Sequence, residues 1–374
     1  MVDEERVFGV GIRGAGQVAR QHAEAIAANP HLRLAAVCSR SHGSAERLAL
    51  EFAGAAKEGP PVRVFRHYPD MLSDAGVDIV SECMPNHLHA REAAAAFDAG
   101  KHLILEKPAA INREELALLG DACRRAGTRS VVSFVLRWHP LVATIRSLLG
   151  RGVIGEPFFS GFDYWHGIKP SFPSYEWIRR EEFAGGAMIT GGCHAADLAR
   201  YLKGEVAEVS AYSTRARDDF DYPTTFSAAV KFRDGTLGRL SASLDGVCFP
   251  YQFNIDLLGT RGAIRDNRLY SNELFPGQKD FSPIPGDTPN SGSVAHHPFK
   301  QEIDDFVESL LTGAPLRSDV LDACRSMEIC LAITESAQSG KPVGIGAPDQ
   351  TTARAGAACQ MIAGSSSAGT RGIP

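Results

Sequence analysis

The chain has 374 residues, of which 44% are hydrophobic and 22% are charged, and its net charge is −5 at pH 7. This length suits two globular domains, and the composition is that of a soluble globular protein. This net negative charge makes nucleic acid an unexpected partner, because nucleic-acid-binding proteins carry an excess of basic residues. No apolar run approaches the ~18 residues that a membrane span needs.

The N-terminus and the cysteines predict a cytoplasmic protein. Residues 1–14 are acidic before the first apolar run, whereas a secretory signal would be basic there. The eight cysteines are scattered and form no C-x-x-C pair. In a chain this long, that pattern indicates reduced thiols rather than a disulfide framework or a structural zinc site.

Up to residue 135, short apolar runs alternate with amphipathic stretches. Asn112 and Glu115 have the spacing of a capping box at the start of the last of these helices. Strands that alternate with helices imply right-handed βαβ units and a parallel sheet. Strands are predicted over residues 6–12, 32–39, 77–84, 101–106 and 129–135, and helices over 16–29, 44–54, 87–100 and 112–127.

After one more helix, predicted over residues 139–152, strand-like runs dominate, and Asp234-Gly235 lies between two of them as a hairpin turn does. The runs cover residues 157–165, 206–214, 224–246 and 251–267, and two late helices are predicted over 299–313 and 318–340. We therefore expect an α/β chain with a parallel-sheet domain over 1–136 and a domain with a large, mostly antiparallel sheet over 137–348. Residues 349–374 are small and polar without periodicity, so a disordered tail is expected there.

The first strand is followed by G-x-G-x-x-A, formed by Gly14, Gly16 and Ala19. Gly14 would allow a tight turn, Gly16 would let the backbone approach a pyrophosphate, and Ala19 would let helix and strand pack closely. The helix N-terminus would then hold the phosphates, with Gln17 and Val18 beside them. Such turns also occur for packing alone, but the position in the first βα unit favours dinucleotide binding.

The end of the second strand reads Cys38-Ser39-Arg40-Ser41 and carries no acid. An NAD-specific fold usually places Asp or Glu there for the ribose hydroxyls. Ser39 and Ser41 could donate hydrogen bonds, and Arg40 could pair with a 2′-phosphate. This pattern favours NADP over NAD, unless Arg40 only covers the adenine, which would suit either cofactor.

Four motifs, taken together, resemble the Gfo/Idh/MocA oxidoreductase family over nearly the whole chain. They are GIRGAGQVA at 11–19, PNHLH at 85–89, EKP at 106–108 and GG…GCHAADL from 185. The resemblance implies a Rossmann domain followed by an α/β domain with an open antiparallel sheet. It also implies a nicotinamide cofactor, oxidation or reduction of a sugar or polyol carbon, and a homodimer or homotetramer.

Lys107 and His194 are the catalytic residues that this resemblance implies. Lys107 follows a predicted parallel strand, at the edge where open α/β sheets bind ligands, although from spacing alone a surface lysine is the better interpretation. Glu106 and Pro108 match the residues that flank the lysine. Pro85, Asn86 and His89 match a segment that lies along the cofactor. Arg137 and Pro140 match the segment at the entry to the second domain.

One position departs from the family pattern. Many members have Asp four residues before the catalytic histidine, whereas this chain has Thr190. Thr190 cannot act as a carboxylate base, but it can donate one hydrogen bond and accept others. Either His194 and Lys107 move the proton without an acidic partner, or the activity differs from that of Asp-containing members. Asp197 could supply part of the missing charge from within the helix.

His194 allows three interpretations: a metal ligand beside Cys193, a catalytic base, or a histidine whose hydrogen bonds are satisfied at a helix end. Adjacent residues rarely bind one ion, and His296-His297 is isolated in a loop, so no metal is expected. A histidine near a helix N-terminus is biased toward its neutral form, which suits a proton acceptor. We expect His194 to take the hydroxyl proton while Lys107 hydrogen-bonds the same oxygen.

The loop from 163 to 182 is rich in aromatic and cationic groups. The expected substrate contacts are Trp165, Lys169, Trp177 and Arg179, together with Thr190 and His194. Core packing of the tryptophans is the alternative, and the two cations would also suit a phosphate or carboxylate on the substrate.

The leading hypothesis is an NAD(P)-dependent dehydrogenase or reductase of a sugar, glycoside or polyol. A second hypothesis is a glycosidase that oxidises its sugar transiently with a tightly held NAD. A third is a non-catalytic, cofactor-binding regulator.

Overall fold

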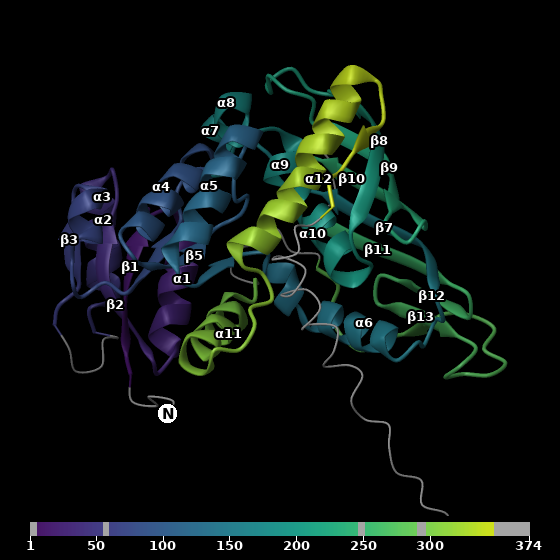
Figure 1. The fold of residues 1–374 in the computed structure, drawn as a ribbon, viewed down its shortest axis with the longest axis horizontal. Coiled ribbons are helices and arrows are strands. Elements are labelled where there is room, and N and C mark those ends of the chain that lie inside the picture. The colour runs from purple at the N-terminus through teal and green to yellow at the C-terminus, as the bar shows by residue number, and fades with distance from the viewer. Residues whose placement is uncertain (1–5, 55–59, 246–250, 290–296, 348–374) are drawn as a thin grey trace, which may run out of the picture.

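The computed structural model describes residues 6–54, 60–245, 251–289 and 297–347 (Figure 1). The tail predicted for residues 349–374 lies outside the described residues. In Figure 1 the purple and blue N-terminal elements form one lobe and the teal and green strands form another. The long helix α12 (Val320–Ser339) lies between the lobes and contacts both.

Six parallel strands form the N-terminal sheet, in the order β3-β2-β1-β4-β5-β6. They are β1 (Phe8–Arg13), β2 (Leu32–Cys38), β3 (Arg63–Phe65), β4 (Ile79–Glu82), β5 (His102–Leu105) and β6 (Ser130–Val132). The predicted parallel sheet is confirmed, and its order is that of a doubly wound dinucleotide fold, which binds its ligand where the order reverses, at β1 and β4. The short β3 was not predicted, because three residues show no periodicity.

Helices cover both faces of this sheet. On one face lie α1 (Gln17–Ala28) and α2 (His42–Phe52), and on the other lie α3 (Tyr68–Leu72), α4 (Asn86–Asp98) and α5 (Arg113–Ala126). Asn112 caps α5 by accepting the N–H of Glu115 at 2.8 Å, and the Glu115 carboxylate accepts the N–H of Ile111 at 3.0 Å. The predicted cap is therefore present, with Glu115 reaching one residue before Asn112.

Nine strands form the second sheet, in the order β14-β13-β12-β11-β7-β10-β9-β8-β15. Its members are β7 (Pro157–Trp165), β8 (Val206–Thr214), β9 (Thr225–Phe232), β10 (Leu237–Ser243), β11 (Gln252–Gly259), β12 (Gly262–Arg265), β13 (Arg268–Ser271), β14 (Ser282–Pro283) and β15 (Val343–Gly344). Strands β7 and β10 are parallel, and the other described neighbours are antiparallel. The hairpin predicted at Asp234-Gly235 joins β9 to β10, with Gly235 at φ +86°.

The remaining helices all follow β6 in the chain. They are η1 (Val135–Trp138), α6 (Pro140–Gly150), α7 (Tyr175–Ile178), α8 (Glu181–Ala184), α9 (Ala187–Thr190), α10 (Cys193–Leu202), α11 (Phe299–Thr312) and α12. Helix α11 returns to α1 and buries Phe299, Ile303 and Phe306 in the core of the first domain. A domain boundary at 136/137 stays a prediction, since part of the late chain completes the early core. In the described ranges, no helix combines the length and apolarity that crossing a bilayer requires.

Candidate active site

The turn after β1 has the geometry that a pyrophosphate needs. Gly14 adopts φ +95°, and a Cβ there would lie 2.6 Å from the carbonyl oxygen of Cys83, so only glycine fits. Gly16 is the N-cap of α1, where an added Cβ would meet nothing within 4 Å and no side chain caps the helix. The first N–H groups of α1 therefore remain open to an anion, with Gln17 exposed and Val18 half-buried beside them. These residues fit a dinucleotide.

The end of β2 lies beside this turn. Gly14 donates its N–H to the carbonyl oxygen of Cys38 at 2.8 Å, which places the residues after Cys38 next to the turn. Ser39 is half-buried and Arg40 is exposed. In a doubly wound fold, this edge holds the ribose of the adenosine half.

Lys107 follows the end of β5, next to a buried ion pair. The Glu106 carboxylate accepts the N–H of Lys107 at 3.2 Å and lies 3.1 Å from Nε2 of His22, whose Nδ1 is 2.8 Å from Oγ of Ser81. Burial alone would raise the pKa of Glu106, but His22 and Lys107 lower it. Burial alone would lower the pKa of His22, but Cys83 and Glu106 raise it well above its ordinary value. Both shifts favour an ion pair between His22 and Glu106, and the Glu106 carboxylate holds the backbone N–H of Lys107 in place.

Glu302 of α11 is a further buried acid near this pair. Ser133 donates a hydrogen bond to its Oε1 at 2.8 Å, whereas its Oε2 is buried without a partner. Burial raises the pKa of Glu302 to about 8, although His22 acts to lower it. The Glu302 carboxyl group is therefore mostly neutral at neutral pH.

Replacing Glu302 by glutamine is expected to weaken the pH dependence of stability. Between the ordinary pKa of 4.5 and about 8, the folded state holds a proton that the unfolded state has released. The free energy of unfolding therefore falls as the pH rises, by at most ~1.4 kcal/mol per pH unit, and the Glu302→Gln variant avoids this loss. Urea unfolding at about pH 5 and about pH 8 measures the difference. Glu308→Gln, at an exposed position of the same helix, is the control, and equal pH dependence in both variants would contradict the prediction.

The start of α4 is tied to the Lys107 turn. His89 is buried, with Nδ1 2.6 Å from the carbonyl oxygen of Pro108 and Nε2 2.7 Å from that of Met84. Both ring nitrogens therefore contact the protein's own backbone, and any contact of His89 with a cofactor would come from its carbon edge. Pro85 is the half-buried N-cap of α4, and Asn86, its first residue, is buried.

His194 lies in the first turn of α10 and is 5% exposed. Tyr164 stacks on its ring, with centroids 5.8 Å apart and 17° between the planes. Nδ1 of His194 is buried without a hydrogen-bond partner. Burial, followed by the nearby Lys107, His297 and His166, holds the pKa of His194 well below its ordinary value. The structure thus brings Lys107 near a neutral imidazole with an uncommitted nitrogen.

Thr190 is held by the chain around it. Its hydroxyl donates to the carbonyl oxygen of Ala184 at 2.8 Å and accepts the side-chain amide of Asn86 at 3.1 Å. The same amide group of Asn86 contacts the Ala184 carbonyl oxygen at 3.1 Å. Thr190 therefore places a neutral hydroxyl, and no carboxylate, four residues before His194, and this hydroxyl joins α4 to the segment before α10.

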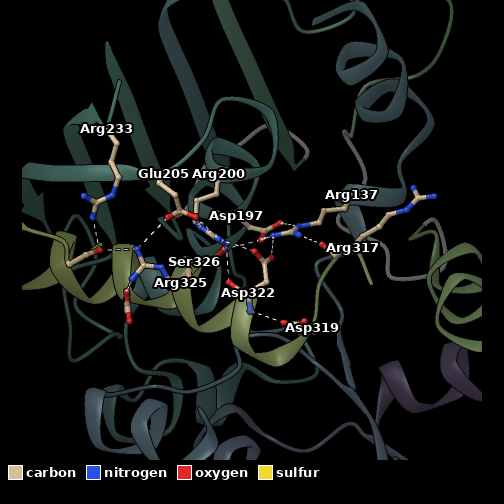
Figure 2. A network of polar contacts seen from close by, with 12 residues as sticks. Arg137, Asp197, Arg200, Glu205, Arg233, Arg317, Asp319, Asp322, Arg325 and Ser326 are labelled. Atoms are coloured by element: carbon tan, nitrogen blue, oxygen red, sulfur yellow. Dashed lines mark hydrogen bonds and ion pairs between the residues drawn. The ribbon is translucent and has the colours of Figure 1, made fainter. Parts of the chain in front are cut away.

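Asp197, one turn after His194, is committed to a different network. Figure 2 shows Arg137 forking onto its two carboxylate oxygens, at 2.9 and 2.5 Å, while Ser326 donates to it at 2.9 Å. Arg137 also lies 2.6 Å from the carboxylate of Asp322. The expectation that Asp197 supplies the missing charge at His194 is therefore wrong, because its carboxylate neutralises Arg137.

Two family models match the chain, one for each sheet. The first, described as an oxidoreductase family with an NAD-binding Rossmann fold, matches residues 8–134. The second, the C-terminal alpha/beta domain of the same oxidoreductase family, matches residues 146–345. The chain belongs to the Gfo/Idh/MocA family. It is an NAD(P)-dependent dehydrogenase or reductase, as its motifs predict.

Relatives in this family match almost the whole chain. The scyllo-inositol 2-dehydrogenase (NAD(+)) of Bacillus subtilis is 27% identical over 350 residues, covering 89% of this chain and 94% of the relative. The D-xylose 1-dehydrogenase (NADP(+)) 2 of Haloferax volcanii is 28% identical over 342 residues, covering 90% and 99%. A solved structure of levoglucosan dehydrogenase with NADH and levoglucosan has the same fold, with a TM-score of 0.80, 23% identity and coverage of 91% and 100%.

Aromatic and histidine side chains surround His194 in this Gfo/Idh/MocA chain. The hydroxyl of Tyr164 lies 3.0 Å from Nδ1 of His166, and Tyr251 meets the rings of both edge-on, at 5.3 and 5.4 Å. Burial and then Lys107 lower the pKa of His166 to about 4. Tyr251 was missed from the sequence, because nothing in its strand pattern indicates that it reaches this site. Within the described ranges, no group of three His, Cys, Asp or Glu side chains converges to hold a metal ion.

The remaining predicted substrate residues are spread along the segment after β7. Trp165 ends β7 and is half-buried, and Lys169 is exposed. Trp177 packs against the edge of the core, and Arg179, the C-cap of α7, pairs with Glu176 of that helix at 3.1 Å. Substrate contact by these four residues stays a prediction.

Proposed function

We propose that the chain transfers a hydride between a nicotinamide cofactor and a carbinol carbon of a sugar, glycoside or polyol. The observation that carries this proposal is the buried, neutral ring of His194, with Nδ1 uncommitted and Lys107 nearby. Lys107 follows β5, which lies between β4 and β6 in the parallel sheet. Doubly wound folds bind their ligands at the carboxyl ends of such strands. Relatives named as scyllo-inositol and D-xylose dehydrogenases support the substrate class.

In this proposal His194 and Lys107 have different roles at the reacting oxygen. The nicotinamide, when bound, supplies the hydride acceptor or donor. In the oxidation direction, His194 accepts the hydroxyl proton, while Lys107 donates a hydrogen bond to the same oxygen and stabilises its negative charge. His194 needs no carboxylate partner for this step, because burial and Lys107 already keep it neutral. With Thr190 and Asp197 committed elsewhere, the proton transfer rests on these two residues.

For the cofactor, we propose a preference for NADP over NAD. The relatives include one NAD(+) and one NADP(+) enzyme, so the proposal rests on the end of β2 in this chain. No acid follows Cys38 there to bind the ribose hydroxyls, and Arg40 is exposed next to the phosphate turn. A guanidinium at this place would pair with a 2′-phosphate.

We also propose a homodimer or homotetramer formed through the nine-stranded sheet. In β8 and β9 buried and exposed residues alternate, so one face of the sheet is turned away from the core. Tyr212 and Leu237 are large, exposed apolar side chains, and the strand register places both on that face. Apolar groups on an otherwise polar sheet face favour association with a second copy.

One experiment tests the reaction and the cofactor together. The purified protein is denatured and any released nucleotide identified, and the native protein is then assayed on sugars, glycosides and polyols by nicotinamide absorbance. We expect turnover with one of these classes and a higher kcat/KM with NADP than with NAD. Equal use of both cofactors would refute the NADP preference. Glycoside cleavage without net change in the nicotinamide would replace the dehydrogenase by the glycosidase hypothesis.

A further inference from the structure

A cavity of about 340 Å³ lies between the two domains, separate from the site described above. Helix α5 forms one wall, α12 forms the second, and residues 344–347, which begin with the last residue of β15, form the third. Neither Lys107, His194 nor the glycines of the phosphate turn line it. The cavity is therefore not part of the nicotinamide and substrate site.

The charged groups that line this cavity are mostly cationic. Arg113 and Arg124 come from α5 and Arg325 from α12, whereas Glu328 is the one acid among the described lining residues. Burial raises the pKa of Glu328, whose carboxylate contacts Arg325. Guanidinium groups have a planar fork of donors that matches phosphate and carboxylate oxygens.

Arg113 and Arg124 can bind a ligand with little loss of folding stability. Arg113 pairs with Glu335 at 2.6 Å and Arg124 with Asp121 at 2.9 Å, and all four side chains are more than half exposed. Ion pairs of this exposure contribute little to stability, because water screens them. A ligand oxyanion can therefore take the place of either carboxylate.

Arg325 is in contrast fixed and deeply buried, at 8% exposure. It contacts Glu328, donates to the carbonyl oxygen of Gly346 at 2.9 Å and lies 3.4 Å from Glu205 (Figure 2). Its Nε–H is buried without a hydrogen-bond acceptor. Folded proteins rarely leave a buried donor unpaired, because the lost hydrogen bond to water lowers their stability. Arg233 also donates to Gly346, so the backbone wall of the cavity is held from two sides.

We propose that this cavity binds a small polyanion carrying phosphate or carboxylate groups, with Arg113, Arg124 and Arg325 as its cationic contacts. The site is built before the ligand arrives, because Arg325 and the 344–347 wall are already fixed. A bound polyanion would contact α5 of the first domain and α12 of the second, and so join the two. By mass action it would stabilise the folded chain.

The test titrates the holoenzyme, saturated with its nicotinamide nucleotide so that the phosphate turn is filled. Pyrophosphate and citrate are the two probes, followed by calorimetry and by the shift in Tm. We expect one site per chain with a Kd below about 1 mM for at least one probe. The probe that binds more tightly identifies phosphate or carboxylate as the preferred group, and saturable binding of neither probe would overturn the proposal.

Variants assign the binding to this cavity. Arg113→Gln with Arg124→Gln changes two exposed side chains, so the fold should be retained, and we expect the Kd to rise at least roughly tenfold. Arg261→Gln is the matched control, since Arg261 forms an equally exposed pair with Glu273 at 3.0 Å outside the cavity. An unchanged Kd in the double variant, or an equal loss in Arg261→Gln, would overturn the assignment.

Discussion

The His194→Asn variant is expected to oxidise its substrate roughly 10²- to 10⁴-fold more slowly than the wild type, which is the usual contribution of a positioned general base. Asparagine keeps a polar side chain in the first turn of α10 but has no basic nitrogen. Nucleotide affinity should change little, because the turn of Gly14 and Gly16, where we expect the phosphates to bind, lies on the other domain. Steady-state kcat and KM, with a separate nucleotide titration, measure the two effects.

Lys107 provides the internal comparison for this prediction. Lys107→Met should also lower kcat strongly, and the double variant should be scarcely slower than the slower single variant, because in the proposed mechanism both groups act on one oxygen. The exposed His67 supplies a matched control, and His67→Asn should keep full activity. A His194→Asn enzyme within a few fold of the wild type would rule out His194 as the base.

The pH profile gives a second view of the same base. A histidine at its ordinary pKa of about 6.5 would lose basicity as the pH falls through that value. Burial and Lys107 lower the pKa of His194 well below it, so His194 stays unprotonated through this range. In the oxidation direction kcat/KM should therefore not fall near pH 6.5 but only under more acidic conditions. An inflection of the wild type at about 6.5 that is absent in His194→Asn would show an unperturbed base instead.

Local sequence pattern was sufficient to predict five of the six strands of the first sheet and the positions of the glycine turn after β1 and the Lys107 turn after β5. Gly14 and Gly16 lie at the start of α1, and Lys107 lies at the end of β5, because short periodic runs determine where each element begins and ends. The hairpin at Asp234-Gly235 was predicted for the same reason, since its turn chemistry is confined to neighbouring residues.

Contacts between distant parts of the chain were not predictable in this way. Helical spacing places Asp197 one turn after His194, but it cannot tell which neighbouring element Asp197 faces. Its partners Arg137 and Ser326 lie 60 residues earlier and 129 residues later in the chain. Likewise, the amphipathic pattern of α11 predicts a buried face, but not that this face would bring Glu302 next to the His22–Glu106 pair.

Replacing Asp197 by alanine is expected to lower the free energy of unfolding by roughly 3–5 kcal/mol, the range for removing one partner of a buried ion pair. Arg137 is 3% exposed and would lose its bidentate acceptor, with Asp322 left as its remaining carboxylate. Although burial alone would raise the pKa of Asp322, Arg137 and Arg200 hold it well below its ordinary value, so that carboxylate stays charged. The loss should therefore lie near the lower end of the range. Urea unfolding of the variant and the wild type measures it.

Two further variants test whether the effect of Asp197→Ala comes from the lost charge of a buried ion pair. Asp197→Asn keeps the size and one acceptor oxygen, so it should destabilise less than alanine while still weakening the hold on Arg137. Glu273→Ala removes a carboxylate from the exposed pair with Arg261, and its effect should stay below ~1 kcal/mol. Because α10 carries both residues, Asp197→Ala should also lower kcat by loosening the helix on which His194 is held. If Asp197→Ala were no more destabilising than Glu273→Ala, the network in Figure 2 would not be what fixes α10 against α12.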